Sequence, residues 1–190
     1  AFFINQSARF GDVVLAANHI LLQLISFAAF FLDAYAFVVE SLVGSSIGAG
    51  RRDIFDRAVK RSTVLALITA VLLASGVWLF GEFAVAVLTD LPEVRVAANS
   101  KLFLAAIYVC ISFAAFQLDG IFIGASATAQ MRNAAFISLA VFLLACWLLI
   151  DRFAINGLWW AMIIYVAARA DALLLFSPGL RRSIPPGPGP

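Results

Sequence analysis

Three carboxylates stand inside apolar segments that are long enough to span a membrane. Asp33 and Glu40 lie within residues 21–44, and Asp119 lies within residues 103–125. A charge in hydrocarbon is costly, so intramembrane carboxylates usually face a bundle interior or a water-filled cavity and mark an ion or substrate path. The sequence therefore predicts transport, with these three residues binding a coupling ion or a substrate.

Asp33 and Glu40 are seven residues apart. On a helix this spacing places them within about 20° of one face and about 10.5 Å apart along the axis. Two stacked carboxylates suit a relay for protons or cations, because burial and a like charge both favour the protonated form. The alternative for Glu40 is a position near the membrane interface, where it only anchors the helix by pairing with a nearby basic segment.

Asp119 lies deep in its apolar segment and is followed by Gly120 and Gly124, a spacing that permits close helix approach. We interpret it as an ion-coupling or substrate-binding residue at which Na⁺ is possible. The alternative is a structural hydrogen bond to a neighbouring helix. Arg169, in the last apolar segment, is a candidate partner for a buried acid.

Aromatic and amide side chains accompany the carboxylates. The possible cavity-lining residues are Tyr35, Phe116 and Gln117. Aromatic rings beside an acid can bind flat organic cations, although packing and lipid contact are the commoner roles of such rings. The sequence contains no nucleophile–base pair, phosphate-binding loop or zinc motif, so we predict no enzymatic activity, no catalytic residue and no cofactor beyond a coupling ion of H⁺ or Na⁺.

The composition predicts an all-α membrane protein. Of the 190 residues, 64% are hydrophobic and 13% are charged, and the mean hydropathy is +1.01. A soluble domain of this length could not bury so much apolar surface. One helix needs about 20 apolar residues to cross a bilayer, so we expect a polytopic bundle of about five full spans plus a partial one at the start. The net charge of +2 is too small to suggest nucleic acid as a partner.

The expected spans follow from the positions of turn residues and charges. They are 13–48, 62–88, 94–125, 134–150 and 158–176, joined by an amphipathic surface segment at 53–60, a turn at 89–93, a polar connection at 127–133 and a turn at 151–157. Residues 1–177 form the transmembrane bundle, and residues 178–190 are expected to be a disordered tail. Residues 1–8 resemble the end of a helix, which suggests a fragment of a longer protein.

The basic residues predict the orientation of the bundle. Arginine and lysine concentrate in 50–61, with further arginines in 126–133 and in the tail, and these three regions share a side if the span count holds. Because short cytoplasmic loops are rich in lysine and arginine, this side and the C-terminus are expected to be cytoplasmic.

Several segments together resemble a known family. They are residues 11–18, 32–41, 44–50, 88–94, 118–125 and 131–133. In order and spacing they resemble the C-terminal half of a multidrug and toxic compound extrusion (MATE) transporter of the DinF-like branch, as far as about Phe176.

The resemblance implies half of a twelve-helix transporter in the bacterial inner membrane, with the lipid bilayer and a missing N-terminal lobe as partners. Members export organic cations or amphipathic drugs in exchange for H⁺ or Na⁺. The NorM-like branch has an acid at the position of Asp119, and Asp33 and Glu40 match the DinF-like pattern. The chain departs from the family at Ala127 and Asp171. The alternatives are a flippase for lipid-linked saccharides, which would need basic residues in its cavity, and a membrane subunit without transport activity.

Overall fold

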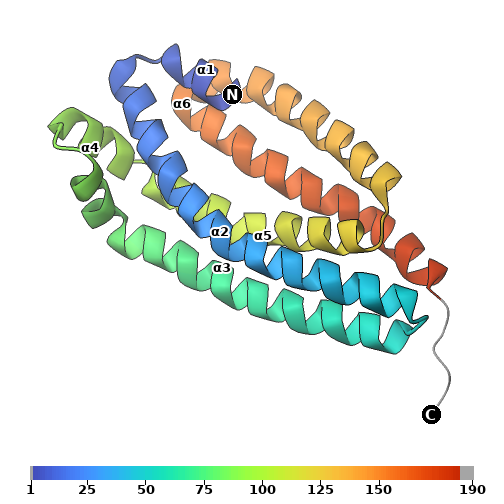
Figure 1. The fold of residues 1–190 in the computed structure, drawn as a ribbon. Coiled ribbons are helices and arrows are strands. Elements are labelled where there is room, and N and C mark those ends of the chain that lie inside the picture. Colours follow the sequence, from blue (N-terminus) through green and yellow to red (C-terminus); the bar gives the residue numbers. More distant parts are fainter. Residues whose placement is uncertain (1, 185–190) are drawn as a thin grey trace.

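The chain folds into a bundle of long helices. The computed structural model describes residues 2–184, and no strand occurs within them. The helices are α1 (Phe2–Ala8), α2 (Asp12–Gly48), α3 (Arg52–Leu88), α4 (Pro92–Asn99), α5 (Leu102–Gly124) and α6 (Thr128–Ser183). Figure 1 shows α2, α3, α5 and α6 running side by side along one bundle. The predicted all-α fold is confirmed.

Helices α2 and α3 form a hairpin of two equally long arms, with 37 residues in each. Gly50 closes it with a φ of 64°, in the left-handed region that favours glycine, and the Arg51 amide donates to the Ser46 carbonyl across the turn. The separate surface helix expected at 53–60 is wrong. These residues are the first turns of α3, because no glycine or proline interrupts the helix before the apolar stretch.

The expected span over 94–125 is divided into two helices. Ser100 and Lys101 form a turn after α4, in which the Lys101 amide donates to the Ala98 carbonyl at 2.9 Å. The polar run Asn99–Lys101 favours such a turn over a continuous membrane helix. Helix α5 therefore starts at Leu102, and its 23 residues suffice for one crossing.

Helix α6 folds back on itself at Ala154, whose φ of 49° and ψ of −127° lie outside the helical region. Its two arms cover 128–153 and 155–183. Gly157 makes the reversal tight, because a Cβ there would collide with the Leu149 carbonyl. The turn expected at 151–157 is confirmed, but the connection expected at 127–133 shortens to 125–127.

Among the described helices, four are long and apolar enough, by length and composition, to cross a membrane: α2, α3, α5 and α6. Because α6 has two arms, the described residues provide five crossings, as expected from the sequence.

The second arm of α6 extends beyond the expected end of the bundle. It continues through Pro178 to Ser183, and Ile184 is buried in a cluster with Phe55 and Leu173. Arg181 and Arg182 lie in its last turn, where cations offset the helix dipole. The disorder expected from residue 178 is therefore wrong for 178–183, and residues 185–190 lie outside the described residues.

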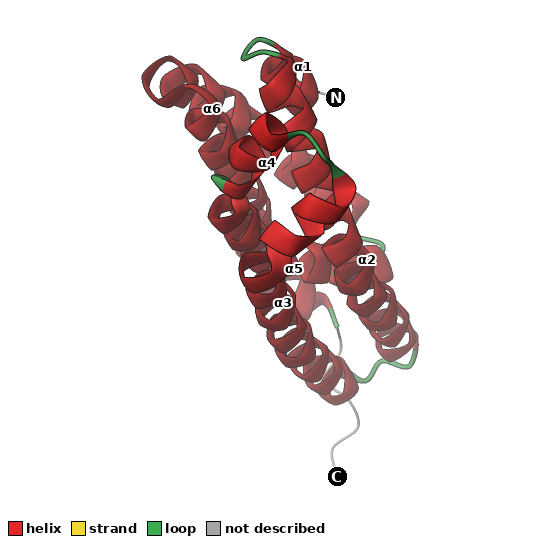
Figure 2. Cartoon of the chain, turned by 90° about the vertical axis from the view of Figure 1, so that its left-hand side faces the viewer, coloured by secondary structure: helices red, strands yellow, loops and turns green. Residues whose placement is uncertain are grey.

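The connections gather at two ends of the bundle. The α2–α3 turn, the α5–α6 turn and the end of α6 lie together, as Figures 1 and 2 show. We call this the basic end, because eight of the 13 lysines and arginines lie there: Arg51, Arg52, Arg57, Lys60, Arg61, Arg132, Arg181 and Arg182. The prediction that these regions share one side is confirmed.

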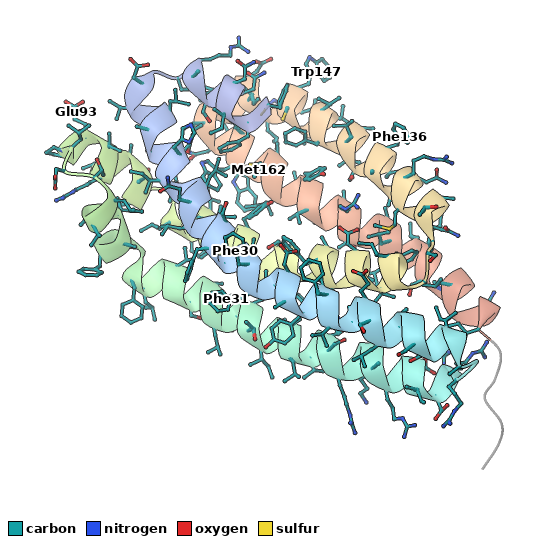
Figure 3. All side chains as sticks on the ribbon, in the orientation of Figure 1. Phe30, Phe31, Glu93, Phe136, Trp147 and Met162 are labelled. Carbon is teal, nitrogen blue, oxygen red and sulfur yellow. The ribbon has the colours of Figure 1, made fainter. Side chains whose placement is uncertain are left out.

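The outer surface of the bundle is apolar. In Figure 3 the labelled side chains Phe30, Phe136 and Trp147 project from the ribbon, and they are 74%, 66% and 71% exposed. Helix α5 lies at the centre, in contact with α2, α3 and α6. A bundle with exposed aromatic and aliphatic side chains on its outer helices suits a lipid environment.

Candidate functional site

Two glycines set the contact between α2 and α5. A Cβ at Gly120 would collide with the Ala36 carbonyl, and a Cβ at Gly124 would collide with the Glu40 carbonyl. The two backbones therefore approach each other closely, as the Gly120–Gly124 spacing predicts. This contact fixes the register between the two helices that carry the candidate carboxylates.

The register places Asp119 close to the level of Asp33, whereas Glu40 lies at the level of Gly124, the last residue of α5. Both helices run toward the basic end, and residues 36 and 40 of α2 meet residues 120 and 124 of α5. With that constant offset, Asp119 lies at the level of residue 35 of α2. Measured along the helix axis, it is about 3 Å from the level of Asp33 and about 7.5 Å from the level of Glu40. That these three carboxylates bind a coupling ion or a substrate stays a prediction.

Asp119 forms an ion pair with Arg169 on the second arm of α6. The Arg169 Nη2 donates to Oδ1 at 2.7 Å and the Nε donates to Oδ2 at 3.0 Å. The Asp119 side chain is 28% exposed and the Arg169 side chain is 17% exposed. A bidentate guanidinium–carboxylate pair is short and strong because both partners are charged and both hydrogen bonds are aligned. In this structure, therefore, a cation of the same chain occupies the carboxylate of Asp119.

Asp33 and Glu40 belong to a polar stripe along α2. Among the described residues, neither makes a hydrogen bond or an ion pair, and both are half-buried. Asp12, His19 and Ser26 continue the same seven-residue spacing, and all three are exposed. A repeat of seven drifts only about 20° per step, so the five residues share one side of the helix. A polar stripe of this length is unfavourable against hydrocarbon, which indicates that it faces water or protein.

The stripe was only partly recognised from the sequence. His19 and Ser26 were not predicted as site residues, although their spacing from Asp33 is a signal that the sequence contains.

Tyr35 and Phe116 take positions apart from the carboxylates. Tyr35 shares a hydrogen bond with Thr69 of α3, with 2.8 Å between the two hydroxyl oxygens. It is two residues from Asp33, and residues two apart on a helix lie about 200° apart. Tyr35 therefore joins α2 to α3 and does not line a cavity with Asp33. Phe116 is half-buried on α5, and its predicted lining role stays a prediction.

Gln117 lies on the opposite side of α5 from Asp119. It is 2% exposed, and its Nε2 donates to the Ser62 Oγ at 2.6 Å. The Ser62 hydroxyl donates its one hydrogen to the Ala58 carbonyl at 2.8 Å, so it can only accept from Gln117. The Gln117 Oε1 is left buried without a partner. Gln117 does line a hollow, of about 430 Å³, but between α3, α5 and α6 and away from the carboxylates.

Within residues 2–184, no three histidine, cysteine, aspartate or glutamate side chains lie close enough together to hold a metal ion. The Na⁺ site at Asp119 stays a prediction.

Long apolar helices that enclose a half-buried ion pair, with a polar stripe along one of them, define a polytopic helical membrane protein. The family model described as MatE matches residues 2–148. The chain belongs to this family, which confirms the resemblance seen in the sequence.

In two comparisons the chain is similar to part of a longer protein. It is 32% identical over 170 residues to the "DNA damage-inducible protein F" of Escherichia coli (strain K12), covering 87% of this chain and 36% of that protein. The crystal structure of the eukaryotic MATE transporter AtDTX14 has the same fold, with a TM-score of 0.79 and 17% identity, covering 90% of this chain and 40% of that one. The chain thus spans little more than a third of the length of these relatives.

Proposed function

We propose that this chain is one lobe of a secondary active antiporter that exports organic cations or amphipathic drugs in exchange for H⁺ or Na⁺. The observation that carries the proposal is the charge at mid-bundle. Three carboxylates lie within about 10.5 Å of one another along the bundle axis, and Arg169 pairs with only one of them. The remaining negative charge favours cations as ligands.

The Asp119–Arg169 pair suggests how binding could be coupled to conformation. A cation or proton that binds Asp119 must compete with Arg169, and a carboxylate that releases Arg169 changes the contact between α5 and α6. Binding at this position therefore has different free energies in the paired and unpaired states, which is the condition for a ligand to shift a two-state equilibrium.

The proposal also says what the polar stripe of α2 faces and how the bundle is oriented in the membrane. The polar stripe of α2 faces a second lobe or the aqueous path between the lobes. The basic end is cytoplasmic in a bacterial inner membrane, because it carries eight lysines and arginines against four at the other end. A flippase for anionic lipid-linked saccharides is less well supported, because Arg169, the one cation at mid-bundle in the described part of the chain, is already paired.

The test is efflux of a fluorescent organic cation by the protein at its full native length, driven by an imposed pH or Na⁺ gradient. Asp119→Asn should remove most of the gradient-driven efflux. Asp171→Asn is the matched control, since Asp171 is an exposed acid of α6 without a partner in the described residues. Full efflux by a well-expressed Asp119→Asn variant, or efflux that responds to neither gradient, would contradict the proposal.

A further inference from the structure

A groove between α3 and the second arm of α6 runs to the basic end, with α5 as its floor. We call it the α3–α6 groove. Its volume is about 430 Å³, and its apolar lining residues are Phe55, Val59, Phe113, Leu118, Ile121 and Leu174. At the basic end an ion pair joins the two walls, since Arg181 donates to the Asp56 carboxylate at 2.8 and 2.6 Å. The groove is thus largely apolar, with Thr63 and Gln117 as polar lining residues, and it is charged at one end.

A second hollow of about 450 Å³ adjoins this charged end. It shares Leu174, Ser177 and Arg181 with the α3–α6 groove and adds Arg52 and Arg182 to the lining. The two hollows therefore meet around Arg181.

The positive charge around the two hollows exceeds the negative charge. Arg52, Lys60, Arg181 and Arg182 line them, against the single carboxylate of Asp56. The Arg52 Nε is buried without a partner, while its Nη2 reaches only the backbone carbonyl of Arg182 at 3.3 Å. Lys60 makes no ion pair within residues 2–184. Uncompensated cations at the end of an apolar groove favour an anion that also carries a hydrocarbon chain.

We propose that the α3–α6 groove binds an anionic phospholipid, with an acyl chain between α3 and α6 and the phosphate at Arg52, Lys60 and Arg182. A free phosphate would leave the apolar walls unused, and an amphipathic cation would meet four positive side chains. The groove lies on the side of α5 that carries Gln117, opposite Asp119, so this site is separate from the carboxylates. The proposal does not depend on antiport.

The experiment is a lipid titration of the protein at its full native length in mild detergent, with bound lipids counted by native mass spectrometry. The probes are phosphatidylglycerol and phosphatidylcholine of equal chain length. We expect one phosphatidylglycerol to bind more tightly than phosphatidylcholine. A juxtamembrane cation contributes about 1 kcal/mol to anionic lipid binding, so Lys60→Gln and Arg182→Gln should each weaken phosphatidylglycerol binding about fivefold.

The control variant is Arg61→Gln, which removes one exposed cation from the same end without touching the groove. It should bind phosphatidylglycerol as the parent does. Ala114→Phe fills the groove from α5 and should weaken both lipids, whereas inorganic phosphate should not displace phosphatidylglycerol. Equal binding of the two lipids by the parent, equal losses in Lys60→Gln and Arg61→Gln, or displacement by phosphate alone would overturn the proposal.

Discussion

Replacing Arg169 by methionine should destabilise the bundle strongly, because it leaves Asp119 charged and unpaired. Methionine retains an unbranched apolar side chain, so packing changes little while both hydrogen bonds, of 2.7 and 3.0 Å, are lost. Removing one partner of a buried ion pair costs about 3–5 kcal/mol. Since the Asp119 side chain retains 28% exposure, we expect the lower value, about 3 kcal/mol, which is more than a hundredfold in the unfolding equilibrium.

The measurement is unfolding by sodium dodecyl sulfate in mixed micelles, applied to the protein at full native length. A double-mutant cycle needs Arg169→Met, Asp119→Asn and the two together. The double variant contains neither charge, so it should lose much less stability than the sum of the single variants.

Two results would refute this reasoning. A loss below about 1 kcal/mol in Arg169→Met is what an exposed pair gives and would mean that water screens the charges. Additive losses, within about 0.5 kcal/mol, would mean that the two side chains do not interact in the membrane.

Three further predictions concern packing and orientation. Gly124→Ala should lower the free energy of unfolding by about 1–3 kcal/mol in the same assay, because the added methyl group would meet the α2 backbone. The control is Gly76→Ala, which should be neutral or stabilising because a methyl group there meets open space. Asn18→Ala should cost about 1–3 kcal/mol, because it leaves the buried Trp159 Nε1–H without an acceptor and removes the hydrogen bond that the Ser7 hydroxyl accepts. Full stability would contradict that network. The orientation can be tested with single cysteines in a cysteine-free background. Ser126→Cys, at the basic end, should react with a membrane-impermeant maleimide only in inside-out vesicles, and Ser100→Cys, at the opposite end, only in intact cells. The reverse labelling would mean the opposite orientation.

The positions of the spans could be predicted because they depend on local properties of the chain. Apolar segments of sufficient length, interrupted by polar turns, locate α2, α3 and the two arms of α6. The Gly120–Gly124 spacing predicted the close contact of α5, although its partner helix was known only from the structure. The break between α4 and α5 was missed, because the polar run at 99–101 is short and apolar residues continue on both sides.

The site was less predictable, because it depends on which helices meet. Arg169 is 50 residues from Asp119, and nothing local selects one acid among several as its partner. The separation of Gln117 from Asp119, by contrast, follows from helix geometry, since residues two apart lie on opposite sides. Proximity in sequence was therefore a poor guide to a shared cavity, and angular position would have been a better one.

The length of the α2–α3 hairpin has a practical consequence. Each arm is about 55 Å long, whereas the hydrocarbon of a bilayer is about 30 Å thick. Lying wholly within hydrocarbon would require a tilt of more than about 50°, beyond the usual range of up to about 40°. Part of the hairpin must therefore extend beyond the hydrocarbon, and the charged turn around Arg51 lies at an end of the hairpin, where headgroups and water can solvate it. An antibody fragment raised against this turn would provide a rigid fiducial for particle alignment in electron cryomicroscopy.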